Sequence, residues 1–83
     1  MSQSAIIEEI RAERVRQDEK WGEQNHPPFI WLVVLGEEVG EACEAALEAQ
    51  YGGKPLANYR AELVQVAAVA LAAIECLDRW ETP

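Results

Sequence analysis

The chain has 83 residues, of which 49% are hydrophobic and 27% charged, a composition typical of a folded domain. This length allows one small domain over residues 1–83, with a core too small to be very stable alone. The net charge of −8 disfavours phosphate backbones and anionic lipid, so we expect neither a nucleic-acid nor a membrane partner. No signal peptide is recognisable, and we expect a cytoplasmic protein with Cys43 and Cys76 reduced, a disulfide being the alternative.

The first predicted element is a helix capped by Ser2 or Ser4 and ending near Lys20. Its apolar positions are sparse, so it packs a narrow stripe and leaves a wide polar face. Glycine and a proline pair within residues 22–28 rule out a continuous helix. This loop, with Trp21 and the only histidine, either contacts a ligand or is anchored on the helices by its tryptophan.

Two longer helices follow. The second is predicted from residues 29–30 to 50–51, where Gly52 and Gly53 offer the positive φ angles of a helix end. The third begins at Pro55 or Asn58, both suited to a first turn or cap, and runs to about residue 79. No segment has the period of a strand, so we predict an all-α fold, a helical hairpin preceded by an N-terminal helix.

The third helix is almost wholly apolar. Between Leu63 and Ile74 its only polar side chain is Gln65. Such a helix is normally buried on all sides, and this short chain has too few elements to surround it. We therefore expect a homo-oligomer.

Glutamates of the second helix fall into two groups. With about 100° between successive residues, Glu37, Glu41, Glu44 and Glu48 form one stripe, which fits a solvated face. Glu38 lies outside that stripe, between apolar neighbours. A carboxylate in that position is costly unless it is paired or bound to a metal.

Register brings acidic residues of the two long helices together. In an antiparallel hairpin, residues at one height have a constant index sum, and Glu38 with Gln65 has the same sum as Glu41 with Glu62. The four side chains are therefore predicted to meet. Oxygen ligands favour Mg²⁺ first and Mn²⁺ next. The alternative is a buried polar cluster satisfied by arginine or lysine of a partner chain.

These segments resemble the signature of the MazG-like all-α nucleoside triphosphate pyrophosphohydrolases, which is Glu-Glu-x-x-Glu on one helix and Glu-x-x-Asp on the next. The chain has Glu-Glu-Val-Gly-Glu at 37–41 and Glu-Leu-Val-Gln at 62–65, with Gln65 in place of the usual aspartate. The likeness covers about residues 30–77. The stretch 14–31 is similar to that of short phage- or cassette-type members.

The resemblance implies Mg²⁺-dependent hydrolysis of a (deoxy)nucleoside triphosphate to the monophosphate and pyrophosphate, as nucleotide-pool house-cleaning. It implies metal ligation by Glu38, Glu41 and Glu62, with Gln65 at the fourth position. It also implies a four-helix bundle completed by two chains, as a homodimer or a dimer of dimers.

Further roles are assigned to residues near this signature. Glu37 or Glu41 would orient or deprotonate the attacking water. Candidates for contacting phosphates are Lys20, Lys54 and Arg60, and candidates for base stacking are Trp21, Trp31 and Tyr59. For each cation the alternative is an ordinary surface charge, and for Trp31 a core position.

Two other functions stay open, and the neutral amide of Gln65 supports the first of them. One is a catalytically degenerate helical oligomer that acts as a nucleotide-binding or regulatory module. The other is a related pyrophosphatase acting on phosphoribosyl-ATP.

Overall fold

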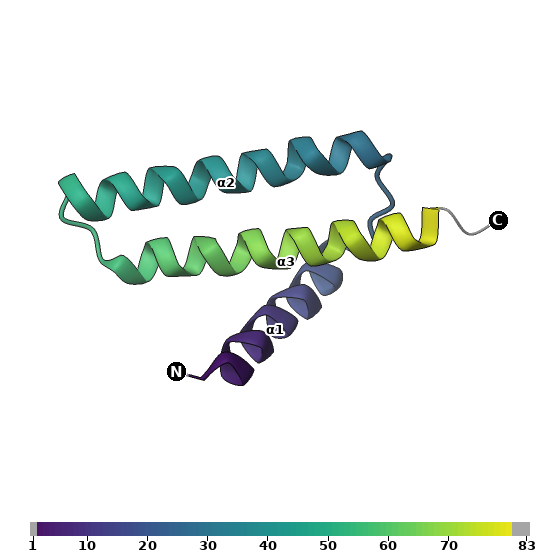
Figure 1. Cartoon of the computed structure of the whole chain (residues 1–83), viewed down its shortest axis with the longest axis horizontal. Helices are drawn as coiled ribbons and strands as arrows, with labels where there is room; N and C mark the ends of the chain where they lie inside the picture. The colour runs from purple at the N-terminus through teal and green to yellow at the C-terminus, as the bar shows by residue number, and fades with distance from the viewer. Residues whose placement is uncertain (1, 81–83) are drawn as a thin grey trace.

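The computed structural model describes residues 2–80. It contains three helices there, α1 (Gln3–Trp21), α2 (Pro28–Tyr51) and α3 (Leu56–Trp80), and no strand (Figure 1). The all-α prediction is confirmed, and each helix begins and ends within two residues of its predicted bounds.

The helix ends follow from local chemistry. Ser2 is the α1 cap, its side chain accepting a hydrogen bond from the Ala5 amide at 3.2 Å. Gly22 ends α1 with φ +74°. At the hairpin turn the prediction was half right, since Gly53 has φ +71° but Gly52 has φ −105°. Asn58 lies inside α3, not at its cap.

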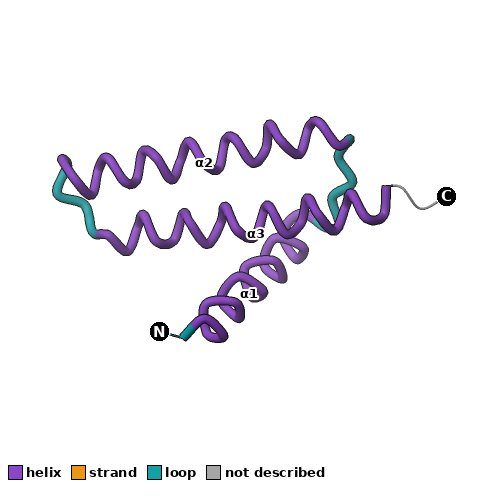
Figure 2. The backbone as a smooth tube through the Cα atoms, viewed as in Figure 1, coloured by secondary structure: helices purple, strands orange, loops and turns teal. Residues whose placement is uncertain are grey.

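The helices are arranged around α3. Helices α2 and α3 run antiparallel as a long hairpin, and α1 crosses α3 obliquely (Figures 1 and 2). Both α1 and α2 pack against α3, whereas the described backbones of α1 and α2 make no close approach to each other. The space between α1 and α2 is therefore left for side chains, and the molecule is elongated, measuring 50 × 27 × 21 Å.

The core is small and lies where the start of α2 meets the end of α3. Its buried side chains are Trp31, Val69, Ala72 and Cys76, with Val34, Leu35 and Ala73 packed against them. Further along the hairpin the buried residues are alanines (Ala42, Ala45 and Ala68). Alanine has almost no side-chain volume, so this part of the interface is thin, and little apolar area stabilises the hairpin on its own.

Helix α1 is held by polar contacts. None of its residues is buried. Arg60 of α3 pairs with Glu9 at 2.7 Å, and Arg14 pairs with Glu75 at 2.8 Å. Each pair includes one side chain that is about half exposed. Surface ion pairs each contribute about 0–1 kcal/mol, so these two contacts stabilise the position of α1 only weakly.

Large apolar side chains are exposed along the hairpin. Leu63 is 46% exposed and Ile74 57% exposed, although the sequence predicts burial for this helix. Next to Leu63 an apolar groove is lined by both long helices (Val39, Ala42, Cys43, Ala46, Tyr59, Leu63 and Val66). Burial of this face in an oligomer stays a prediction.

Two sequence expectations can be compared directly with the fold. Cys43 is exposed and Cys76 is buried, and they form no disulfide. Within residues 2–80, none of the helices combines the length and apolar character required to cross a bilayer.

Candidate metal centre and adjoining pocket

Three glutamates meet across the hairpin. Glu38 and Glu41 project from α2 and Glu62 from α3, and each offers a carboxylate oxygen within 4.8 Å of the other two. The hairpin register predicted this convergence, because the turn lies close to the centre of the index sum. Such proximity also occurs on acidic surfaces that bind no ion, so the surroundings of the triad matter.

Glu38 has the most perturbed environment of the three. Burial raises the pKa of its carboxyl, and the charges of Glu41, Glu62, Glu37 and Glu13 raise it further. Every charged group that shifts this pKa is another glutamate, so the carboxylates repel one another. A divalent cation bound at the triad would relieve that repulsion, and its preference for oxygen ligands matches the donor set.

The other glutamates of α2 lie as the helical period predicts. Glu37, Glu44 and Glu48 are exposed. Glu41 is exposed too, whereas Glu38 and Glu62 are partly buried. The acidic stripe is therefore a solvated face, and Glu41 is the residue where that face meets the triad.

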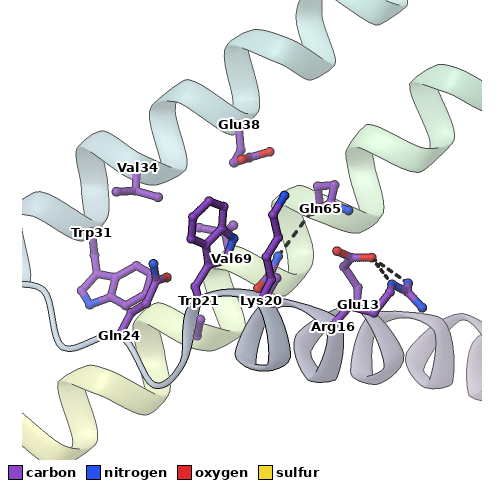
Figure 3. Close-up of a pocket in the computed structure, with 12 residues that line it drawn as sticks. Glu13, Arg16, Lys20, Trp21, Gln24, Trp31, Val34, Glu38, Gln65 and Val69 are labelled. Atoms are coloured by element: carbon purple, nitrogen blue, oxygen red, sulfur yellow. Dashed lines mark hydrogen bonds and ion pairs between the residues drawn. The ribbon is translucent and has the colours of Figure 1, made fainter.

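Gln65 is engaged with α1. Its side-chain carbonyl accepts a hydrogen bond from the Gln17 amide at 3.3 Å. Gln65 and Glu38 line the same pocket, and the place of Gln65 as a fourth member beside the triad stays a prediction. The oxygen proposed as a fourth metal ligand is, however, already a partner of Gln17 in this structure (Figure 3).

Replacing Gln65 tests this arrangement. Gln65→Asp is expected to tighten Mg²⁺ binding by about tenfold, because an added ligand charge increases affinity at such sites. Without metal, the same variant should melt at a lower temperature, since the Gln17 bond is lost and a fourth carboxylate is added. Calorimetric titration with Mg²⁺ and thermal unfolding measure the two effects.

Gln65→Ala is the control for that experiment. It removes the bond to Gln17 without adding charge, so it should lower the melting temperature and leave Mg²⁺ affinity unchanged. Equal Mg²⁺ affinities for Gln65→Asp and the wild type would show that position 65 does not reach the ion.

A pocket of about 470 Å³ adjoins the triad. Residues of α1, α2 and α3 line it, and Glu38 forms part of the wall contributed by α2. Figure 3 shows Lys20 and Trp21 extending from α1 toward α2 on the side of Glu38. Lys20 Nζ lies 4.8 Å from the centroid of the Trp21 ring. The pocket therefore combines a carboxylate wall with a cation and an aromatic ring.

The predicted substrate-contacting residues are not all in this pocket. Lys20, Trp21 and Trp31 line it, but Trp31 is only 3% exposed and forms part of the core. Tyr59 lies in the apolar groove of the hairpin. Lys54 lies in the hairpin turn, and Arg60 is bound to Glu9.

Several pocket residues were missed by sequence reasoning. Glu13, Arg16 and Gln17 of α1 and Gln24 of the following loop also line the pocket, and Glu13 pairs with Arg16 at 2.6 Å. The signal was present, because residues 13, 16, 17, 20 and 21 lie on one side of a helix. That side carries charge, amides and an indole instead of a uniform solvated surface.

No protein-family model, curated protein sequence or solved structure was found to match the chain. The fold and the site therefore define only a class, an all-α three-helix protein with a carboxylate triad across its hairpin.

Proposed function

We propose that this protein hydrolyses nucleoside triphosphates to the monophosphate and pyrophosphate with Mg²⁺, or with Mn²⁺ in its place. The observation that carries the proposal is the convergence of Glu38, Glu41 and Glu62 beside a pocket with a cation and an exposed indole. Carboxylates next to a cation suit a metal-bound polyphosphate, and the indole suits a base. The resemblance of the two motifs to the MazG-like signature supports the same reaction.

The three triad residues would hold the ion. When bound, Mg²⁺ offsets phosphate charge and lowers the pKa of a bound water. Glu41 is the exposed member of the triad, and this exposure supports a role in accepting a proton from the attacking water. Glu37, exposed on the neighbouring face, is the other candidate for this role.

The pocket side would hold the substrate. Lys20 lies on the wall contributed by α1, where its ammonium would offset the charge of a substrate phosphate. The Trp21 ring is 62% exposed and offers a free face for a base. The interior position of Trp31 suits a wall of the pocket better than a stacking platform.

A homodimer or dimer of dimers completes the proposal. A second copy would cover the exposed apolar face of the hairpin and build a four-helix bundle from two hairpins. The exposure of Leu63 and Ile74 on long helices supports this assembly.

The bond between Gln17 and Gln65 favours a second candidate function. With the position-65 oxygen engaged, three carboxylate ligands remain and the fourth ligand position is taken. An incomplete ligand set suits a nucleotide-binding or regulatory oligomer without turnover. Binding of a nucleotide without release of pyrophosphate would identify this function.

Pyrophosphate release from a panel of ribo- and deoxynucleoside triphosphates, with phosphoribosyl-ATP included, tests the proposal. The wild type should release pyrophosphate only with Mg²⁺ or Mn²⁺. Glu62→Gln should lower turnover by at least about 100-fold. Loss of a residue that only hydrogen-bonds to a metal ligand already lowers activity by about 10- to 100-fold, and loss of a charged ligand itself should cost no less.

Glu44→Gln is the matched control for Glu62→Gln. It removes the same charge close to the triad but from the exposed stripe, so turnover should stay within about twofold of wild type, as for a surface substitution. Absence of turnover for every nucleotide, together with no Mg²⁺ binding, would refute the enzyme function.

A further inference from the structure

The loop between α1 and α2 presents one side-chain amide to the pocket. Of the three glutamines that line the pocket, Gln17 and Gln65 hydrogen-bond to each other. The side chain of Gln24 makes no hydrogen bond to another residue within 2–80. Figure 3 shows it extending between the indoles of Trp31 and Trp21. Gln24 therefore holds a donor and an acceptor ready for a ligand.

The backbone of Gln24 is held firmly although it lies in a loop. Arg79, at the end of α3, donates to the Gln24 carbonyl at 3.2 Å and to the Asn25 side chain at 3.0 Å. The same guanidinium pairs with Glu23 at 2.7 Å. Three consecutive residues are thus tied to one side chain, whose planar fork suits several fixed acceptors. These contacts fix the backbone from which the Gln24 side chain extends.

The pocket has the size and lining of a base site. Its volume of about 470 Å³ falls within the range of about 300–1,000 Å³ found for small-molecule sites. The Trp21 indole is exposed and can cover the face of a base, and the buried Trp31 indole forms part of the pocket lining. Stacking on an aromatic side chain does not distinguish between bases. Discrimination between them therefore requires a hydrogen bond to the edge of the base.

We propose that the Gln24 side chain reads the edge of the nucleobase, with Trp21 against the ring face and Arg79 as a positioning residue. The inference rests on the proposed function, since a nucleotide must occupy the pocket. An amide can donate and accept at adjacent atoms of a base edge. Gln24 is then a specificity-determining residue and has no part in the chemical step at phosphorus.

The test compares kcat/KM for four deoxynucleoside triphosphates that differ only in the base. Gln24→Ala should reduce the spread between the best and worst base by about tenfold, in line with one lost edge contact. Gln24→Glu, which accepts but does not donate when ionised, should change the order of preference. Both variants should act mainly through KM, with kcat for the best base nearly unchanged.

Gln50→Ala, the same change on the exposed end of α2, is the matched control and should keep the wild-type preference. Arg79→Ala should reduce the spread as Gln24→Ala does, again through KM. An equal loss for all four nucleotides in the Gln24 variants would mean that Gln24 only stabilises the loop. An unchanged spread, or a wild type without base preference, would also overturn the inference.

A second measurement separates this inference from the proposed reaction. Free deoxynucleosides, without metal, are titrated against the tryptophan fluorescence of the wild type and of Gln24→Ala. Base-dependent quenching that Gln24→Ala removes supports the reading role even if no triphosphate is hydrolysed. Hydrolysis whose base preference ignores Gln24 overturns the reading role alone, and absence of both hydrolysis and nucleoside binding overturns both proposals.

Discussion

Glu38→Gln is expected to raise the melting temperature of the metal-free protein and to abolish its stabilisation by Mg²⁺. Burial and four neighbouring carboxylates raise the pKa of Glu38, so its charge destabilises the fold near neutral pH. Removing a like-charge interaction gains about 0.5 kcal/mol, which corresponds to roughly 2–4 °C in a domain of this size. If Glu38→Gln is more stable than the metal-free wild type but inactive, the Glu38 carboxylate serves function and does not stabilise the fold.

The metal-dependent part of this prediction is larger. At a Mg²⁺ concentration 100 times its Kd, binding to the native state alone contributes about 2.7 kcal/mol, or roughly 10–20 °C. Wild type should show this rise in thermal unfolding, and Glu38→Gln should show almost none. The proposed turnover should fall by at least about 100-fold, since Glu38 is proposed as a direct ligand.

The effect on stability depends on pH with a defined sign. Because the folded pKa of Glu38 is raised, its ionisation lowers stability at neutral pH. That penalty disappears as the pH falls through the folded pKa toward the ordinary value of about 4.3. The difference in melting temperature between Glu38→Gln and the metal-free wild type should therefore be greatest above that window and vanish below it.

Glu44→Gln serves again as the control, since it removes a charge from the exposed stripe. It should keep the full Mg²⁺-dependent rise. If Glu38→Gln also kept that rise and its turnover, Glu38 would have no place in the metal centre.

Leu63→Lys is expected to convert the proposed oligomer into a monomer with its helices intact. Leu63 lines the apolar groove of the hairpin and is 46% exposed, so a lysine there remains hydrated in a single chain. In an interface the same ammonium would be buried without a partner, at a cost of about 2 kcal/mol or more. That cost corresponds to a loss of association of roughly 30-fold or more.

Light scattering after size-exclusion chromatography measures the mass, and circular dichroism measures helix content. Val15→Lys is the matched control, because Val15 is 55% exposed on α1, outside the hairpin groove. It should leave the mass unchanged. A wild type that elutes as a stable monomer would remove the reason to expect an oligomer.

The hairpin and its triad were predictable because they depend on local patterns and one register. Helix ends follow from Ser2 and the glycines at the turn, whose effects act within a few residues. Once the position of the turn is known, the alignment of two antiparallel helices is fixed. Residues with the same index sum then lie at the same height, and Glu41 lies opposite Glu62. In the structure, carboxylate oxygens of Glu38, Glu41 and Glu62 lie within 4.8 Å of one another.

The position of α1 was not predictable. No residue of α1 is buried, so its apolar pattern carries little information about its partner. Its contacts with α3 are made by polar pairs such as Arg60 with Glu9 and Arg14 with Glu75, which are 51 and 61 residues apart. Many alternative pairings exist among the exposed charges, and none has a distinctive spacing.

From the sequence alone, one can derive three helices, the hairpin register and the separation of Glu38 from the solvated stripe. Capping, helical period and turn position are properties of neighbouring residues, so no knowledge of the folded shape is needed. Only the tertiary structure decided that Gln65 is bound to Gln17 and that Gln24 enters a pocket beside Glu38. Those contacts depend on how α1 crosses α3, which is set by side-chain pairs distant in sequence.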